Sequence, residues 1–335
     1  METNIVYQGN CKEQLSWMPD NSIQCVVTSP PYWGLRDYGH ADQIGLEETP
    51  EKYVDDLVEV FSEVKRVLKD DGTIWLNLGD TYYSKGGASR HKGYSDPKYP
   101  NGRNGEFAEP QTAPHEFLKA KDLVGIPWRV AFALQERLGL YLRQAIIWHK
   151  PNAMPSSVKD RPVTDYEFIF LLSKSEKYYY DYEAVLEPYE EELNRYGGNH
   201  IRGDFKTKYP DGQVAVPERA GRNMRPNPKG RNCRAVWSFN TQPYPEAHFA
   251  VFPEELPERC IKAGTREGDI VLDIFAGSGT TLLVAKRLNR KYIGIELSEE
   301  YISLINKRLS QQSMDEFTYS NSNIKSSHNM EEQNK

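Results

Sequence analysis

Residues 270–281 read Ile-Val-Leu-Asp-Ile-Phe-Ala-Gly-Ser-Gly-Thr-Thr, a short apolar run followed by a glycine-rich turn. The pattern predicts a strand, a tight turn at Gly277 and Gly279 and then a helix, because glycine lets the backbone turn sharply and approach a ligand closely. Glu296 follows Asp273 at the end of the next apolar run, where a carboxylate can accept hydrogen bonds from ribose hydroxyls. The stretch therefore predicts an adenosine-binding edge of a sheet.

The same stretch narrows the class of cofactor. A dinucleotide fingerprint has Gly or Ala three places after the second glycine, where this chain has Leu282. A phosphate-binding P-loop needs a Gly-Lys-Ser/Thr sequence, which is absent. A ligand with ribose and adenine but no phosphate fits better, and S-adenosylmethionine is the common one. The alternative is an ordinary turn between a strand and a helix.

Short apolar runs alternate with helical patterns along the rest of the chain, which favours an α/β fold with a parallel sheet and helices on its faces. We expect strands at 5–7, 23–27, 73–78, 140–149, 165–172, 269–273 and 291–296, and helices at 51–69, 122–138, 246–263, 280–289 and 298–310. A turn at 70–72 should separate the first long helix from its strand. Two irregular stretches, 84–120 and 187–245, are long enough to be either functional or disordered.

Thr28-Ser29-Pro30-Pro31-Tyr32-Trp33 is the second unusual stretch, directly after an apolar run. Proline fixes φ and has no backbone donor, so the Ser29 hydroxyl and the proline carbonyls are expected to face a ligand. An exocyclic amino group of a nucleobase is a poor nucleophile, because its lone pair is delocalised into the ring. Acceptors at its N–H groups would concentrate the lone pair, while an aromatic face would hold the base by stacking. The alternative is a rigid surface turn with partly buried aromatic rings.

Together the two motifs resemble those of the amino-methylating DNA methyltransferases. The segment 28–32 is similar to their catalytic motif and 273–281 to their cofactor motif, in the order of the circularly permuted β group. The resemblance implies a Rossmann-like S-adenosylmethionine-dependent methyltransferase sheet with an irregular target-recognition insertion. The expected parts are a catalytic half at 1–186 with a mobile loop at 84–120, a target-recognition region at 187–245, a cofactor-binding half at 246–310 and a disordered tail at 311–335.

The resemblance also implies roles for single residues. In the catalytic motif, which includes Pro31, Ser29 and the Pro30 carbonyl would hold the target amino group and Tyr32 would stack on the flipped base. In the cofactor site, which includes Asp273, the methionine end would lie at Gly277 and Gly279, the adenosyl group at Phe275, the ribose at Glu296 and the adenine at Asn10 and Cys11. Lys150 is either a neighbour of the target base or a solvated surface lysine.

The first residue of the catalytic motif bears on the choice of base. Family members with serine there usually methylate the N4 amino group of cytosine, whereas those with Asp or Asn usually methylate the N6 amino group of adenine. Ser29 therefore favours cytosine. Methylation of carbon 5 requires a cysteine nucleophile in a Pro-Cys dipeptide, and no cysteine of this chain follows a proline. We expect direct in-line methyl transfer to a base flipped out of the duplex.

The net charge of −6 argues, taken alone, against a nucleic-acid partner, but the charge is unevenly distributed. Residues 195–234 contain ten basic side chains against three acidic ones, a local net charge of +7, and residues 84–103 carry +4. Such segments are either solvated surfaces or phosphate-binding ones, and their place between the two motifs favours DNA. The candidate contacts to double-stranded DNA are Lys150, Arg219, Arg222, Arg225 and Arg231.

Composition indicates a cytoplasmic enzyme. No run of 18 apolar residues occurs, the N-terminus lacks the pattern of a secretory signal, and the four cysteines form no Cys-x-x-Cys pair, so we expect neither a membrane span nor a metal site. We expect a monomer or dimer and a cognate restriction endonuclease that acts on the same DNA site without direct contact. An N6-adenine enzyme, an RNA methyltransferase and a catalytically silent DNA-binding relative remain the alternatives.

Overall fold

The computed structural model describes residues 1–40, 42–83, 115–188, 227, 229–241 and 252–311. These residues form two compact units, one from Met1–Tyr180 together with Ala235–Lys335 and the other from Asp181–Arg234. The described part of the second unit contains the short 3₁₀ helix Glu183–Val185 and an antiparallel bridge between Glu187 and Arg231. The predicted division at 186, 245 and 310 stays a prediction.

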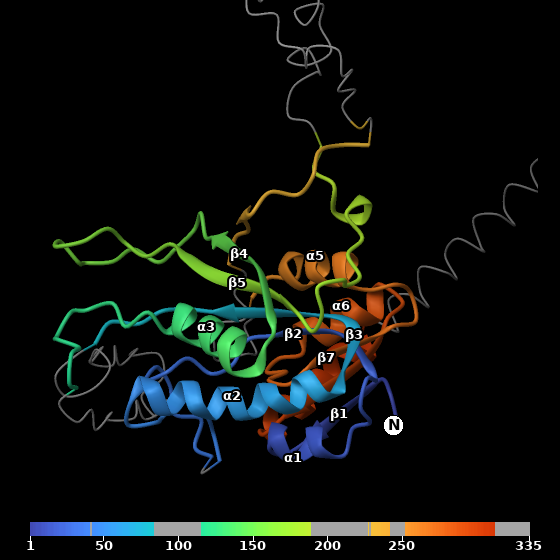
Figure 1. Cartoon of the computed structure of the whole chain (residues 1–335), viewed down its shortest axis with the longest axis horizontal. Coiled ribbons are helices and arrows are strands. Elements are labelled where there is room, and N and C mark those ends of the chain that lie inside the picture. The colour runs from blue at the N-terminus through green and yellow to red at the C-terminus, as the bar shows by residue number, and fades with distance from the viewer. Residues whose placement is uncertain (41, 84–114, 189–226, 228, 242–251, 312–335) are drawn as a thin grey trace, which may run out of the picture. The chain divides into compact units, whose positions relative to one another are not determined.

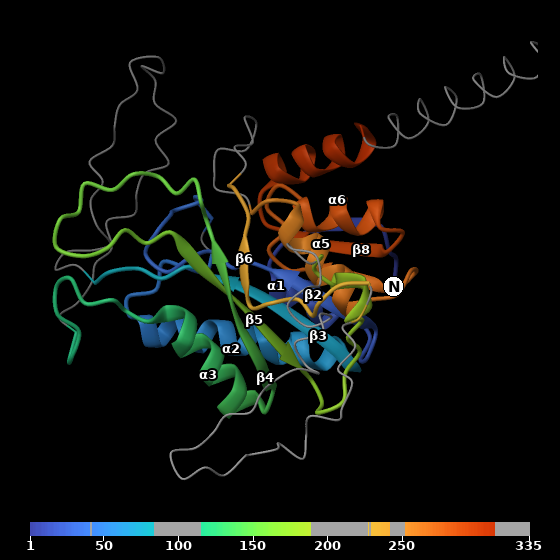
Figure 2. The same ribbon diagram turned by 90° about the horizontal axis from the view of Figure 1, so that it is seen from above.

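The first unit is built on a mixed sheet of eight strands in the order β1-β8-β7-β2-β3-β5-β4-β6 (Figure 2). The strands are β1 Ile5–Gln8, β2 Ile23–Thr28, β3 Leu68–Leu78, β4 Tyr141–His149, β5 Tyr166–Ser173, β6 Val236–Ser238, β7 Ile270–Asp273 and β8 Lys291–Glu296. The predicted α/β sheet is confirmed.

The expected parallel sheet is interrupted at one strand. β5 runs antiparallel to both of its neighbours, β3 and β4. The physical reason lies in the connection: residues 150–165, all of which are described, contain no helix. A parallel crossover usually needs a helix to return to the same edge, whereas a simple loop joins antiparallel neighbours.

Helices cover both faces of the sheet, with α1, α2 and α3 on one face and α5 and α6 on the other (Figure 1). Their bounds are α1 Cys11–Ser16, α2 Pro50–Val67, α3 Ile126–Leu138, α5 Glu255–Gly264 and α6 Thr280–Arg287, and residues 299–311 are also helical. α3 begins later than predicted because Gly125 has a left-handed φ of 79° and the Asp80 carboxylate accepts the N–H groups of Gly125 and Ile126, at 3.0 Å each. α5 begins at Glu255, later than the predicted 246, and residues 246–251 of its predicted range lie outside the described part.

The transition from α2 to β3 explains another difference. The expected turn at 70–72 is a bulge within β3, because Leu68 pairs with Ile23 and Thr73 already pairs with Cys25. Thr49 caps the start of α2, where its side chain accepts the N–H of Lys52 at 3.2 Å. The predicted amphipathic helix is confirmed, and its apolar side faces the sheet.

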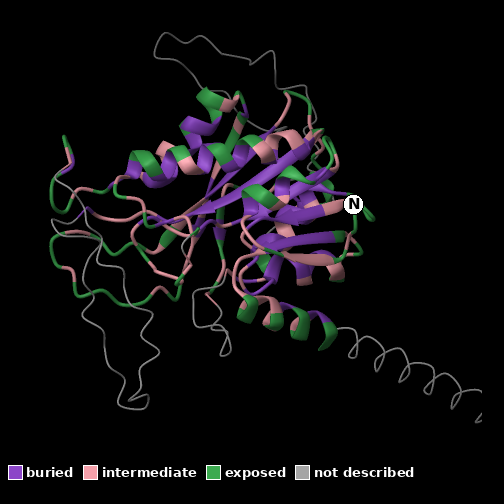
Figure 3. Cartoon of the chain, turned by 90° about the horizontal axis from the view of Figure 1, so that it is seen from below, coloured by how far each residue is buried: buried purple, intermediate pink, exposed green. Residues whose placement is uncertain are grey.

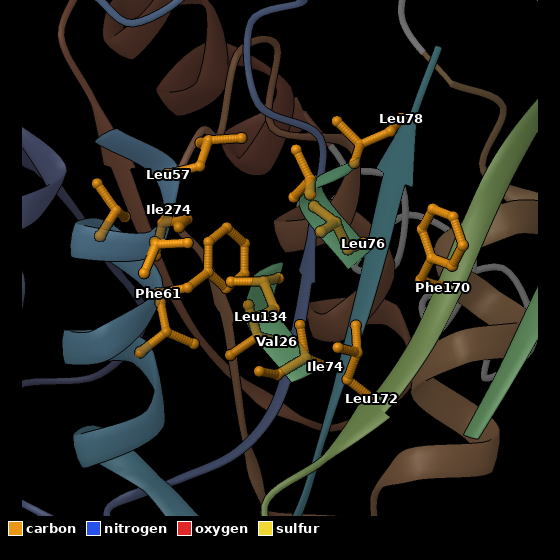
Figure 4. Packing of buried hydrophobic residues seen from close by; sticks show 14 of the residues in the cluster. Val26, Leu57, Phe61, Ile74, Leu76, Leu78, Leu134, Phe170, Leu172 and Ile274 are labelled. Atoms are coloured by element: carbon orange, nitrogen blue, oxygen red, sulfur yellow. The ribbon is translucent and has the colours of Figure 1, made fainter. Parts of the chain in front are cut away.

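The main core lies between α2, α3 and the central strands. Leu57 and Phe61 of α2 and Leu134 of α3 pack against Val26 and Ile74 of the sheet (Figure 4). The central strands are largely buried, whereas the outer sides of the helices are exposed (Figure 3). No helix in the described residues is long and apolar enough to cross a membrane.

We predict that Phe61→Ala lowers the free energy of unfolding by about 3–5 kcal/mol, because the ring is fully buried and its loss leaves a cavity. Denaturant unfolding measures the change. Ser62→Ala, on the exposed side of the same helix, is the control and should change stability by less than about 0.5 kcal/mol. Equal stability of the two variants would contradict the packing described.

Candidate active site

One pocket brings the two sequence motifs together at the carboxyl ends of β2, β7 and β8. β2 and β7 are neighbouring parallel strands, paired at Val26 and Leu272, so the residues that follow them emerge at the same edge of the sheet. The pocket has a volume of about 1230 Å³. The predicted residues that line it are Asn10, Cys11, Ser29, Pro30, Pro31, Tyr32, Lys150, Asp273, Phe275, Gly277 and Glu296.

A buried hydrogen bond ties the motifs to each other. The Thr28 hydroxyl donates to Oδ1 of Asp273 over 2.7 Å, and the same oxygen accepts the N–H of Phe275 at 3.2 Å. Burial raises the pKa of Asp273 to about 6, against the lowering effect of the hydrogen bonds from Thr28 and Thr281. Asp273 therefore fixes the geometry of the turn at the end of β7.

The glycine turn is held by Glu296. Its two carboxylate oxygens accept the backbone N–H groups of Gly277, at 2.7 Å, and Ser298, at 3.0 Å. Gly277 and Gly279 have left-handed φ angles of 51° and 77°. A Cβ atom at Gly279 would lie 2.9 Å from Ile305, so this glycine faces the helical residues 299–311 and is not among the residues that line the pocket.

The start of α1 forms the next part of the wall. Asn10 caps this helix, with its Oδ1 accepting the N–H of Lys12 at 2.9 Å. The N–H of Gly9 donates to the backbone carbonyl of Glu296 at 3.0 Å, which joins β1 to the cofactor edge. Burial raises the pKa of the Cys11 thiol to about 12, so Cys11 lines the pocket as a neutral group.

These residues fit a ligand that carries ribose and adenine without phosphate. Burial raises the pKa of Glu296, yet its carboxylate keeps lone pairs that can accept from ribose hydroxyls. Phe275 is half-buried and lines the same wall, where its ring can cover an apolar ligand surface. The acceptor carboxylate at this wall suits hydroxyl groups and would repel a phosphate.

The prolines of the catalytic motif are not equivalent. The carbonyl of Pro31 accepts the hydroxyl of the fully buried Tyr53 at 2.9 Å. Among the described residues no donor reaches the carbonyl of Pro30, which also lines the pocket. Pro30 and Ser29 thus place acceptor oxygens at the pocket wall, and their role in holding a ligand stays a prediction, while Pro31 anchors the turn to α2.

Two polar residues of the pocket, Asn77 and Glu167, were not predicted from the sequence. The Tyr32 hydroxyl donates to Oε2 of Glu167 at 2.7 Å and lies 3.3 Å from Oδ1 of Asn77. Asn77 is a buried polar residue in the apolar strand β3, and Glu167 is a carboxylate near the start of β5. Polar residues inside apolar strands were the signal that could have identified them. Gly79 was also missed, since a Cβ there would lie 2.6 Å from the Tyr32 ring.

The loop after the catalytic motif was also not predicted to line the pocket. Residues 35–40 and 42–44 line the pocket, and Gln43 holds the loop by accepting the N–H of Tyr38 at 2.7 Å and donating to the carbonyl of Arg36 at 3.1 Å. Desolvation raises the pKa of Tyr38, with Arg36 opposing the shift. The loop has no regular pattern, so periodicity could not reveal it.

The structure distinguishes between the two interpretations of Lys150. Its side chain is 19% exposed and pairs with Glu167, and its ammonium lies 4.4 Å from the centre of the Trp148 ring. Lys150 is therefore part of the pocket wall and not a solvated surface lysine.

Arg219, Arg222 and Arg225 lie outside the described residues, and Arg231 pairs with Glu187 in the second unit. DNA binding by these residues stays a prediction.

Comparison with known proteins gives consistent matches. A family model described as DNA methylase, for N6 and N4 methyltransferases, matches residues 23–307. The chain is 47% identical over 304 residues to the type II methyltransferase M.Cfr9I of Citrobacter freundii, covering 91% of this chain and 87% of that protein. It is 45% identical over 313 residues to the type II methyltransferase M.SmaI of Serratia marcescens, covering 92% and 93% respectively.

Solved structures share the fold. The PvuII DNA methyltransferase (cytosine-N4-specific) aligns with a TM-score of 0.59 and 21% identity, covering 92% of this chain and 86% of that one. A putative DNA modification methylase of Thermus thermophilus, solved as a complex with S-adenosyl-L-methionine, aligns with a TM-score of 0.53 and 26% identity, covering 91% and 93%.

We predict that Asp273→Asn changes the pH dependence of stability. A carboxyl whose folded pKa is raised to about 6 from 3.8 stabilises the fold most below pH 3.8 and loses that contribution as the pH rises through 6. The neutral amide does not titrate, so from pH 4 to pH 7 the variant should gain stability relative to the unmodified chain by about 2–3 kcal/mol. Urea unfolding at several pH values measures the difference. The exposed Asp70→Asn provides the control, and a pH-independent difference at Asp273 would contradict the prediction.

Proposed function

Because the chain belongs to the DNA methylase family of N6 and N4 amino-methyltransferases, we propose that it methylates the N4 amino group of a cytosine flipped out of double-stranded DNA. The chain is a DNA methyltransferase, and its methyl donor is S-adenosylmethionine. The choice of cytosine over adenine and the roles of single residues are our proposal. They rest on the pocket that joins Ser29 to the glycine turn.

The observation that carries the proposal is the acceptor pair Ser29 and Pro30 beside the cofactor edge. An amino group has two N–H bonds, and two acceptors that engage them turn the nitrogen lone pair toward the methyl donor. They also stabilise the positive charge that develops on the nitrogen. A serine at the first position of the motif is typical of the N4-cytosine members, and the structural neighbour from PvuII is described as cytosine-N4-specific.

Different residues of the pocket would bind different parts of S-adenosylmethionine. Glu296 would accept from the ribose hydroxyls, Phe275 would cover the adenosyl group, and Gly277 would let the backbone approach the methionine end. When bound, the cofactor supplies an electrophilic methyl group on a sulfonium, which the amino nitrogen displaces in line. The buried neutral thiol of Cys11 is no nucleophile, which agrees with transfer without a covalent enzyme intermediate.

We further propose a restriction–modification setting in the cytoplasm, because the relatives from Citrobacter and Serratia are named type II methyltransferases. The cognate endonuclease would act on the same DNA site without contacting this chain, which would act as a monomer or dimer. The basic stretch 187–245, with Arg219, Arg222, Arg225 and Arg231, would read the DNA, because arginine can pair with phosphates and with guanine edges. The loop 84–120 would lie near the DNA or the cofactor.

We predict that Ser29→Ala lowers the rate of methyl transfer by about 100-fold or more while leaving the affinity for S-adenosylmethionine unchanged, because only an acceptor for the target amine is lost. Plasmid DNA from a host without DNA methylases is the substrate, and nucleoside mass spectrometry identifies the product. N4-methylcytosine is the expected product. Methyladenine would overturn the choice of base, and an unchanged rate would overturn the role of Ser29. Ser62→Ala is the matched control.

A separate prediction concerns the cofactor. Glu296→Gln keeps the shape of the side chain but removes its charge, so the affinity for S-adenosylmethionine should fall roughly 10- to 100-fold, the amount expected for losing charge-assisted hydrogen bonds. Isothermal titration calorimetry measures the affinity without any DNA. Glu299→Gln changes an exposed neighbour and should bind normally. Equal affinities for the two variants would refute the assignment of Glu296.

A further inference from the structure

Behind Ser29 lies a set of polar side chains, of which Asn77 and Glu167 have been given no role so far. Glu167 receives three donors: the Tyr32 hydroxyl at 2.7 Å, Nδ2 of Asn77 at 3.1 Å and the ammonium of Lys150. The Glu167 side chain is 15% exposed, and the carboxylate sits in the wall of the pocket. A carboxylate with this many donors is held in one position.

The direction of each hydrogen bond in the set is fixed. Nδ2 of Asn77 also donates to the carbonyl of Phe168 at 3.1 Å, and because a carbonyl can only accept, the amide cannot be reversed. Oδ1 of Asn77 therefore faces Tyr32 as an acceptor at 3.3 Å. The Tyr32 hydroxyl has one proton, and the shorter bond to the charged Glu167 oxygen takes it.

This direction extends to Ser29. With its proton on the side of Glu167, the Tyr32 oxygen presents lone pairs to Ser29, whose hydroxyl donates to it at 3.4 Å. The proton of Ser29 then points away from the substrate, and the lone pairs of its oxygen are left for an amino N–H. Burial raises the pKa of Tyr32 well above its usual value, and the charge of Glu167 raises it further, so the tyrosine stays a donor.

We propose that Glu167 is a positioning residue for methyl transfer, which acts on Ser29 through the Tyr32 hydroxyl and is the final acceptor of the proton that the target amine loses. This inference rests on the proposed function, since it requires an exocyclic amine at Ser29. The negative charge of Glu167 polarises both hydroxyls in turn and makes the Ser29 oxygen a stronger acceptor, as in other chains of hydrogen bonds.

The proton balance of the step is complete. As the new nitrogen–carbon bond forms, the bond from carbon to sulfur breaks and its electron pair stays on sulfur. The nitrogen becomes positively charged and releases one proton to the Ser29 oxygen. Ser29 passes its own proton to the Tyr32 oxygen, and Tyr32 passes its proton to Glu167. The two hydroxyls end unchanged, the methylated amine is neutral and the carboxyl is protonated.

The test compares single-turnover methyl transfer by Tyr32→Phe, Glu167→Gln and the double variant, with enzyme in excess over plasmid DNA from a host without DNA methylases. Tyr32→Phe keeps the aromatic ring and removes only the hydroxyl. Each single change should lower the rate on the order of 100-fold, the lower end of what positioned proton transfer contributes. The KM for DNA and the affinity for S-adenosylmethionine should stay unchanged. The double variant should be no more than about 3-fold slower than either single one, because both changes break the same chain.

The outcomes separate this role from a structural one. If Glu167 only anchored Lys150 and Asn77, the change Glu167→Gln would slow the Tyr32→Phe enzyme by the same factor as the unmodified enzyme. The rate of the double variant would then fall by the product of the two single effects, and this result would overturn the proposal. A normal rate for Tyr32→Phe would also overturn it, even if Glu167→Gln failed to fold. Tyr141→Phe and Glu136→Gln, both exposed, are matched controls.

The same measurements tell this proposal apart from the proposed function. Methyladenine as the product of the unmodified enzyme would overturn the choice of cytosine. The methylation rates of the unmodified enzyme, the two single variants and the double variant would still decide the role of Glu167, because both bases present an amine. Absence of any methylation would overturn both.

Discussion

The hydrogen bond from Thr28 to the buried carboxylate of Asp273 is the contact on which the pocket depends. It joins the last residue of β2 to the last residue of β7, two strands from opposite ends of the chain. The parallel pairing of these strands brings the catalytic and cofactor motifs to one edge, and the hydrogen bond fixes their distance at that edge. Methyl transfer needs two reactants held within a short, defined separation, and here the sheet sets that separation before either ligand binds.

The pocket holds the two carboxylates of our proposals, Glu296 and Glu167, in different ways. Glu296 accepts two backbone N–H groups, so its position follows from the path of the glycine turn. Glu167 is held by side chains, among them the ammonium of Lys150, and its position follows from the packing of β3, β4 and β5. Backbone hydrogen bonds would keep the Glu296 carboxylate in a constant position, which suits a cofactor that binds in the same place in every turnover. A carboxylate bound by side chains can tune the reacting groups that its partners touch.

Much of the fold could be predicted from the sequence, because its signals are local. The apolar runs at 270–273 and 291–296 and the period of 51–69 predict elements that the structure confirms, and the motifs predict the cofactor edge. The antiparallel direction of β5 was not predicted, since it depends on how a loop returns in space. Asn77 and Glu167 were missed for the same reason: their partners are distant in sequence, and only strand pairing brings them beside Tyr32. The roles of the predicted site residues stay predictions, while the meeting of Ser29, Pro30, Phe275, Gly277 and Glu296 in one pocket is a property of the fold.

The pairing of β1 with β8 places the first and last of the described strands side by side, with Asn4 donating from its N–H to the carbonyl of Tyr292 at 2.7 Å. The sheet itself is open, with β1 and β6 at its edges, but the described strands begin and end at neighbouring positions in it, so the order of the motifs depends on where the path of the chain is opened. A linker between the two ends and a new opening in a surface loop would give the cofactor motif first and the catalytic motif second, with every contact in the pocket retained. The linear order of the motifs thus depends on where the chain is opened, whereas the active site depends on which strands lie side by side.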